Sequence, residues 1–344
     1  MNVAEAITSG DASLLPGKRD EDWRWTDLRG LVRQVPAASP EGRAWAWTSP
    51  LAGRVDTEVR VVNGRGPTDL EVVAGEERFV AWRFLSTAEA GAHNAELWVS
   101  VGEGGTLTLV ESYEGAGAGY LSNTRINIRL AKGARVERVV LADDGAEGVS
   151  VVDASVELAA EASFAQTVLT NGARRQRIET RVAHPGAGAK LRLDGAYLLA
   201  GQRNSDLTTI VDHQAVDGAT IQLTKGVVRD QSRGVFQGRI VVAEGADRTD
   251  ARMGHHALIL SDKAEVDARP ELLIFADDVQ CAHGNTIGAL DEDALFYAEQ
   301  RGMPAEVAKA LLTQAFVGEV IERIENEAVR EAAEAWAAER LELS

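Results

Sequence analysis

The sequence predicts a mainly β protein with helical regions at both ends, and we expect the β region to form a β-helix. Between about residues 78 and 288, short segments alternate apolar and polar residues, as in LTLVES, INIRL, KLRLDG and RIVVAE. Turns of small residues, such as AKGAR, HPGAGAK and AEGAD, recur roughly every 20–30 residues with no helix-length pattern between them. This pattern is typical of coils that stack on one another. A jelly roll or sandwich is the alternative, but small tight turns favour the β-helix.

The charge balance and the single cysteine limit the possible functions. The 344 residues include 36 Lys and Arg and 53 Asp and Glu, which gives a formal net charge of −17. This excess of acid argues against a nucleic-acid-binding surface and against electrostatic attachment to a membrane. One cysteine cannot form an intrachain disulfide, and it fits a reducing compartment. The sequence shows neither a signal-peptide pattern nor a membrane-spanning apolar run, so we expect a cytoplasmic protein.

Residues 1–77 are expected to form a small N-terminal domain of mixed, partly helical structure. Its most distinctive stretch is RDEDWRWTDLRGLVRQ. The apolar positions of this stretch are Trp23, Trp25, Leu28 and Leu31 or Val32. Their spacing places apolar side chains on one side of a short helix or turn. The stretch is therefore interpreted as a hydrophobic anchor.

Residues 289–344 are expected to form a C-terminal helical domain that follows the β-helix of residues 78–288. Asp291 can cap a first helix that stops at Gly302, and Pro304 suits the first turn of a second helix. The second helix carries an apolar stripe: Ala308, Leu311, Leu312, Ala315, Phe316, Val320, Ile321 and Ile324. The Ala- and Glu-rich tail, ENEAVREAAEAWAAERLEL, is expected to be helical and solvated.

Cys281 and His283 form the most distinctive candidate site. Residues i and i+2 of a strand project to the same face, so the thiol and the imidazole would lie side by side. Such a pair can supply two ligands to iron or zinc, and any further ligands would come from elsewhere. The alternative is a buried cysteine beside a hydrogen-bonded histidine. A Cys–His protease is disfavoured, because no orienting partner or oxyanion turn is evident.

The other histidines give weaker signals. His255 and His256 are adjacent, so in a strand they face opposite ways and at most one joins a site. His213 is isolated in the sequence, and His184 of HPGAG is expected in a loop.

A group of carboxylates suggests a second function. Asp277 and Asp278, together with Asp250 and Asp267, could serve a carbohydrate-active β-helix enzyme. Adjacent strand residues diverge, however, and Asp is common in turns. No Walker A or dinucleotide-binding motif is present, so any nucleotide would be bound by a partner.

Four stretches agree in order and spacing with one known family. They are DEDWRWTDL (20–28), SRGVFQGRIVV (232–242), TDA (249–251) and LLIFADDVQCAHGNTIGALDEDALFYAEQRGM (272–303). They resemble the SufB/SufD family of iron–sulfur cluster assembly subunits. The resemblance covers roughly the whole chain and is most specific over residues 232–316. The short chain, its one cysteine and the motif C-A-H-G-N-T favour the SufD side of the family.

The resemblance implies a right-handed parallel β-helix flanked by helical domains, and a subunit that is not an enzyme. It implies pairing with SufB through the β-helices and docking of the ATPase SufC on the C-terminal domain. His283 matches the histidine that faces a SufB cysteine, and Cys281 matches a neighbouring family cysteine. The segment with Leu295, Phe296 and Tyr297 matches the SufC-contacting region. The two aromatic residues lie about 100° apart on a helix, so one is expected in the core and the other exposed.

The resemblance also bears on cofactors and assembly. It implies that the isolated chain holds no cofactor stably, and that iron or a nascent iron–sulfur cluster is held transiently at the SufB interface. We expect partner pairing to extend a sheet near the C-terminal coils, and isolated copies could form a homodimer through the same edge. The alternative function is a stand-alone β-helix enzyme that acts on polysaccharide through Asp277 or Asp278.

Overall fold

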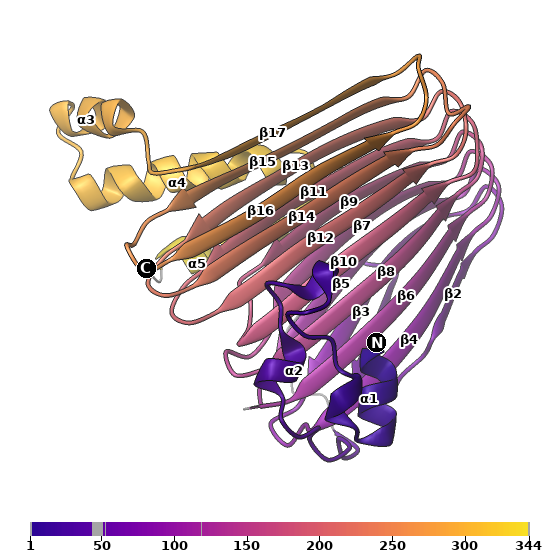
Figure 1. The fold of residues 1–344 in the computed structure, drawn as a ribbon, viewed down its shortest axis with the longest axis horizontal. Helices are drawn as coiled ribbons and strands as arrows, with labels where there is room; N and C mark the ends of the chain where they lie inside the picture. The colour runs from indigo at the N-terminus through magenta and orange to yellow at the C-terminus, as the bar shows by residue number, and fades with distance from the viewer. Residues whose placement is uncertain (1, 43–50, 52, 118, 343–344) are drawn as a thin grey trace.

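The computed structural model describes residues 2–42, 51, 53–117 and 119–342, and two parallel β-sheets dominate it (Figure 1). One sheet has nine strands in the order β1-β3-β5-β7-β9-β11-β13-β15-β17, and the other has eight in the order β16-β14-β12-β10-β8-β6-β4-β2. Successive strands along the chain thus alternate between the sheets. This arrangement is a parallel β-solenoid, so the predicted β-helix is confirmed. A jelly roll is rejected, because its strands would be antiparallel.

The strands have the following bounds. The nine-stranded sheet contains β1 (Thr57–Val62), β3 (Glu77–Ser86), β5 (Thr106–Gly115), β7 (Arg135–Asp143), β9 (Ser163–Thr170), β11 (Lys190–Leu199), β13 (Ala219–Val228), β15 (Asp250–Ile259) and β17 (Gln280–Gly288). The eight-stranded sheet contains β2 (Asp69–Val72), β4 (Ala92–Val101), β6 (Leu121–Leu130), β8 (Val149–Leu158), β10 (Arg175–His184), β12 (Asn204–His213), β14 (Arg233–Val242) and β16 (Glu265–Ile274).

Paired strands begin ahead of residue 78, where the sequence placed the start of the β region. Strand β1 pairs with β3, and the short β2 pairs with β4. The alternating segment TEVRVV of β1 has the period of a strand, although it lies among Pro- and Gly-containing breaks.

The core lies between the two sheets and is built from columns of side chains in register. Leu109, Arg138, Gln166 and Leu193, for example, are partners on consecutive strands of the nine-stranded sheet. Most inward positions are apolar and buried. A single coil cannot bury its inner face alone, so stacking supplies the hydrophobic stabilisation.

One charged pair lies inside this core. The guanidinium of Arg138 donates two hydrogen bonds of 2.6 Å to the carboxylate of Glu111, and both side chains are fully buried. Arg138 also donates to the amide oxygen of Gln166 at 2.6 Å. Buried charges remain tolerable only when they are paired and hydrogen-bonded in this way.

The N-terminal segment lies on the outer face of the eight-stranded sheet (Figure 1). It contains α1 (Val3–Ser9), η1 (Ala12–Leu14), η2 (Glu21–Trp23) and α2 (Leu28–Leu31). Leu28 is buried, and the Trp23 ring covers the Arg177 guanidinium at 4.5 Å. Arg177 in turn pairs with Asp206 at 2.6 Å. The hydrophobic anchor is confirmed, and beneath it lies a buried ion pair that the sequence did not reveal.

Three helices follow β17: α3 (Glu292–Gln300), α4 (Ala305–Ile321) and α5 (Glu327–Glu342). The predicted cap is confirmed, because the Asp291 side chain accepts from the N–H groups of Asp293 and Ala294. The expectation of a solvated tail is wrong. One side of α5 is buried with outward-facing residues of the nine-stranded sheet, such as Val139 and Leu141. Its buried positions are Val329, Ala332, Ala333, Trp336 and Ala337.

The predicted stripe on α4 is only partly buried: its first half buries Ala308 but leaves Leu311 exposed and Leu312 half-buried. In its second half, Val320 and Ile321 are buried in the same cluster as α5. The first half of α4 and all of α3 project beyond the sheets (Figure 1). No helix in the described part of the chain is long and apolar enough to cross a membrane.

Candidate functional site at the open end of the solenoid

Within the described residues, no further coil stacks on the last coil of the solenoid. Strand β17 is the final strand of the nine-stranded sheet, and β16 is the final strand of the other. Each pairs on one side only, so each leaves a row of backbone groups without a strand partner. We call the surface formed by β16 and β17 the open end.

Cys281 and His283 both face inward on β17. Their register partners on β15 are Ala251 and Met253, which are buried in the core. Register partners in a parallel sheet project to the same side, so the thiol and the imidazole take core-facing positions. Cys281 is nevertheless only half-buried, and His283 is exposed, because no strand of the described structure lies over the last coil.

The thiol of Cys281 is held in its protonated form. Burial raises the pKa of the Cys281 thiol above its usual value, and the carboxylate of Asp250 adds to the rise. A hydrogen bond from the Ala251 N–H opposes it. Binding of a metal at Cys281 would therefore release a proton.

A third polar residue continues the row. Asn285 lies two residues after His283 and opposite His255 of β15. Its amide oxygen lies 2.7 Å from His255 Nδ1, and His255 Nε2 lies 2.9 Å from the Tyr197 hydroxyl. Burial lowers the pKa of His255 to about 4, so this ring is neutral at pH 7. Sequence reasoning missed Asn285, although its i+4 spacing from Cys281 signalled the shared face.

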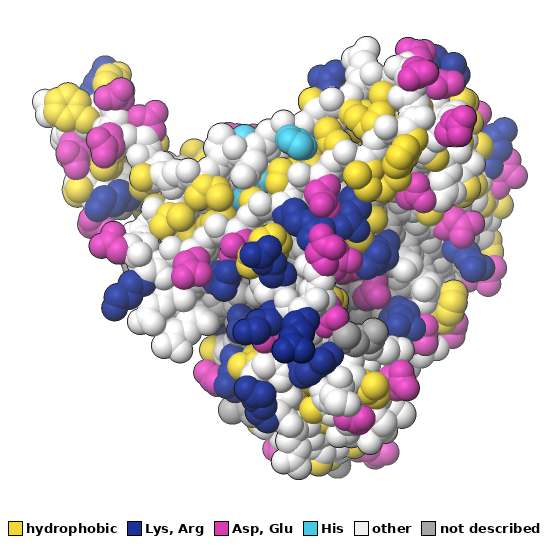
Figure 2. All heavy atoms as spheres, viewed as in Figure 1, with side chains coloured by type: hydrophobic (Ala, Val, Ile, Leu, Met, Phe, Trp, Pro, Cys, Tyr) yellow, Lys and Arg dark blue, Asp and Glu magenta, His cyan; other side chains and the backbone are white. Residues whose placement is uncertain are grey.

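The open end also exposes apolar side chains. Phe275 is 65% exposed and Ile287 is 42% exposed, and Leu273 and Ile274 at the end of β16 are exposed as well. Figure 2 shows hydrophobic and histidine side chains together on the face that carries the last strands. Exposed apolar side chains beside unpaired strand edges are typical of a surface that another chain covers.

The structure places the remaining histidines differently from the sequence interpretation. His255 and His256 do face opposite ways, since His255 is buried and His256 bonds Thr286 at 2.7 Å on the outer face. The loop assignment of His184 is wrong, because it is the buried last residue of β10. It stands in register with His213, and their ring centroids are 4.4 Å apart. Only the coil register reveals this pair, because 29 residues separate the two in sequence.

The carboxylates suggested for an enzyme do not form one cluster. Asp277 and Asp278 are exposed in the loop between β16 and β17. Asp250 pairs with Arg252 on β15, and Asp267 pairs with Arg233 on the outer side of the other sheet. Among the described residues, no three His, Cys, Asp or Glu side chains gather into a metal site.

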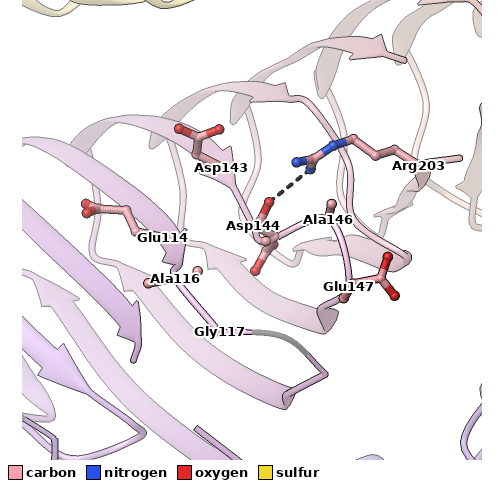
Figure 3. Close-up of a pocket in the computed structure, with 10 residues that line it drawn as sticks. Glu114, Ala116, Gly117, Asp143, Asp144, Ala146, Glu147 and Arg203 are labelled. Atoms are coloured by element: carbon pink, nitrogen blue, oxygen red, sulfur yellow. Dashed lines mark hydrogen bonds between the residues drawn. The ribbon is translucent and has the colours of Figure 1, made fainter. Parts of the chain in front are cut away.

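A pocket of about 580 Å³ lies at an earlier coil, between the loops that follow β5 and β7 (Figure 3). Several of its acidic side chains are bonded within the chain. Glu114 pairs with Arg83 at 2.8 Å, and Asp144 accepts from the Tyr120 hydroxyl at 2.6 Å. Arg203 donates to the main-chain oxygen of Asp144 at 2.9 Å.

The projecting helices carry a separate apolar surface. We call α3 and the first half of α4 (residues 292–312) the arm. Phe296 and Tyr297 are 62% and 60% exposed, and Val307 and Leu311 are also exposed. The expectation that one aromatic residue would be core is wrong. Helix α3 packs mainly on α4, so most of its circumference, including both rings, stays in solvent. Leu295 is half-buried.

Comparison with known proteins agrees with the architecture. Residues 84–316 match the SufBD core domain of SUF-system FeS cluster assembly. The iron–sulfur cluster assembly protein SufD of Escherichia coli is 29% identical over 296 residues, which cover 86% of this chain and 68% of that protein. The chloroplastic protein ABCI7 of Arabidopsis thaliana is 30% identical over 290 residues, covering 79% of this chain and 60% of that protein. An iron–sulfur cluster assembly SufBD family protein of Synechocystis is 29% identical over 237 residues, covering 66% and 52%.

The fold and the open end define a two-sheet parallel β-solenoid with helices at both ends and a Cys–His row on its last strand. The chain belongs to the SufBD family and is an iron–sulfur cluster assembly protein of the SUF system. The matched segments span between about half and about two thirds of the lengths of these relatives.

Proposed function

We propose that this chain supplies one half of a cluster-assembly site and carries no catalytic centre of its own. The observation that supports this proposal is the exposure of two core-facing ligands, Cys281 and His283, at the open end. A neutral imidazole and a thiolate suit iron, but two ligands leave its coordination incomplete. A second chain that covers the open end would bring the remaining ligands. Iron or a nascent iron–sulfur cluster is the cargo of this site, held transiently.

The partner that fits the open end is SufB, a second β-solenoid. Alternate residues of an edge strand direct their backbone N–H and C=O groups outward. The N–H groups of Glu265 in β16 and of Phe275 just after it donate to the preceding coil, so the odd-numbered N–H groups point inward. The N–H groups of the even-numbered residues of β16 therefore point outward. Pro270 therefore removes one outward donor from this edge. Strand β17 lacks such a gap, so the proposed pairing extends the nine-stranded sheet. In the absence of SufB, two copies would pair through the same edge.

The experiment for the half-site compares two histidines. His283→Ala should abolish most cluster assembly by the complete complex while leaving the fold intact, because it removes an exposed ligand. Cys281→Ser should have a smaller effect. The control is His256→Ala, which removes an imidazole from the outer face of the neighbouring strand. Normal maturation of iron–sulfur enzymes in cells that carry only His283→Ala would contradict the proposal.

The arm is proposed to dock the ATPase SufC. Large exposed side chains on a projecting helical surface suit a partner interface, where aromatic residues are enriched as anchors. Phe296→Ala or Tyr297→Ala should weaken SufC binding by roughly 1–3 kcal/mol in titration calorimetry, with circular dichroism to confirm folding. Val73→Ala, a change at an exposed apolar residue outside the arm, is the matched control. If all three variants bind SufC with equal affinity, the arm is not the docking surface.

A further inference from the structure

We infer that Asn285 is a third contributor to the half-site and donates a hydrogen bond to a sulfide or thiolate bound to the iron there; this inference rests on the proposed function of the open end. Cys281, His283 and Asn285 project to one face of β17, opposite Ala251, Met253 and His255. A ligand held by the first two side chains therefore lies beside the third.

A buried relay fixes the orientation of the Asn285 amide. The amide oxygen can only accept, so His255 Nδ1 carries the proton and donates to it over 2.7 Å. In a neutral ring Nε2 is then an acceptor, and it receives the Tyr197 O–H at 2.9 Å. The direction of both bonds follows from that single proton. With its oxygen turned toward His255, Asn285 has its two amide N–H donors left for a ligand at the open end.

Packing holds the relay in place. The His255 ring stacks on Phe236 with centroids 4.7 Å apart and planes 2° apart. The Tyr197 ring occupies space that only glycine leaves free. A Cβ at Gly226 would lie 2.1 Å from ring carbon Cζ of Tyr197, and a Cβ at Gly234 would lie 2.4 Å from ring carbon Cε2. Tyr197 and His255 are fully buried, so the solenoid core positions a side chain that is itself exposed.

The chemistry of the amide suits sulfur. A neutral amide N–H group is not a metal ligand, but hydrogen bonds to the sulfurs are among the factors that set the reduction potential of an iron–sulfur cluster. Tyr197 and His255 touch no ligand and act through Asn285, so they are positioning residues. The relay therefore couples the core to the electronic properties of the cargo.

The test uses the complete complex, reconstituted with ferrous iron and sulfide, and measures the reduction potential of the assembled cluster. Asn285→Asp keeps an acceptor for His255 but removes both N–H groups and adds negative charge, so the potential should become more negative. Asn285→Ala should shift it in the same direction by a smaller amount. The matched control is Thr286→Val, which removes the similar histidine contact on the opposite face of the same strand. It should leave the potential unchanged.

A second measurement follows the relay itself. Tyr197→Phe removes the donor to His255 Nε2 at almost constant volume. In ¹⁵N-histidine NMR spectra, the Nδ1–H tautomer of His255 should lose population, and the potential should change with it. Unaltered potentials in both Asn285 variants, with cluster still lost in His283→Ala, would overturn this inference alone. Equal cluster binding by wild type and His283→Ala would overturn the proposed function and the inference together.

Discussion

Inward-facing polar side chains are buried and paired in the inner coils of this solenoid but accessible and without a completed site on its last coil. Inside, Arg138 and Glu111 are fully buried and satisfy each other with two short hydrogen bonds. On the last coil, Cys281 and His283 take equivalent core-facing positions, yet no described side chain completes a metal site around them.

The difference shows how one repeated structure can serve both stability and assembly. A polar group enclosed between two coils must find its partner within the chain, or it destabilises the fold. The same position on the last coil carries no such requirement, because water or a second chain can satisfy it. Function can therefore be placed on the terminal coil at little cost in stability.

The largest expected effect is on the enclosed pair. Arg138→Met leaves the Glu111 carboxylate buried without its partner, and this should lower the free energy of unfolding by about 3–5 kcal/mol. Urea denaturation at pH 7 measures the change. The control is Arg252→Met, whose pair with Asp250 is exposed on both sides and is expected to contribute less than about 1 kcal/mol. Similar losses in the two variants would contradict the contrast between enclosed and exposed polar groups.

Low pH should lower the stability of the fold through its buried histidines, His184 and His213. Burial lowers the pKa of His184 to about 3 and of His213 to about 4. A histidine in the unfolded chain has a pKa near 6.5. Between pH 6.5 and about pH 4 the unfolded chain therefore binds more protons than the folded chain. Their contribution to stability is complete above pH 6.5 and falls as the pH decreases. Between pH 7 and pH 5 the loss should be on the order of 2 kcal/mol for each residue.

Denaturation of His184→Leu at pH 7 and pH 5 checks this prediction. The variant removes one of the two titrating rings, so its stability should fall less steeply with acid than that of the wild type. If the wild type and His184→Leu lose the same free energy of unfolding between pH 7 and pH 5, these rings do not control the acid response.

An apolar change at the open end should affect pairing rather than folding. Phe275→Ala removes the most exposed ring of this surface and is expected to weaken partner association by about 2 kcal/mol. Sedimentation of mixtures with SufB measures the association. Ile221→Ala alters an exposed aliphatic residue on the outer face of β13 and serves as the comparison. If both variants pair as tightly as the wild type, this apolar surface does not form the interface.

The smallest expected effect is on the stability of the open end itself. His283→Ala should change the free energy of unfolding by no more than about 0.5 kcal/mol, because the side chain is exposed. Met253→Ala, its buried register partner, should cost about 2–5 kcal/mol. Thermal and urea unfolding of the two variants compare the same column position one coil apart. A large loss in His283→Ala would mean that the residue has a structural role.

Much of the fold and part of the site could be predicted from local sequence. Alternating apolar residues and small turns predicted the coils, and Asp291 predicted the start of α3. The spacing of Cys281 and His283 placed both on one face. Local pattern failed for the α5 tail, because an Ala- and Glu-rich helix is buried or exposed according to whether an apolar surface lies beside it. Here the outer residues of the nine-stranded sheet provide that surface.

The sequence by itself determined most of the strands between residues 78 and 288 and which of their residues share a face, since both follow from a period of two along the chain. It did not reveal β1 and β2, and it placed His184 in a loop. Only the tertiary structure decided which residues meet across coils. The number of residues in each coil sets the register, and this register brings His184 to His213 and Asn285 to His255. Tertiary structure also decided that Cys281 and His283 stay accessible. Their local pattern is that of a core strand, and the row stays uncovered because β17 is the last strand of its sheet in the part of the chain that the structure describes.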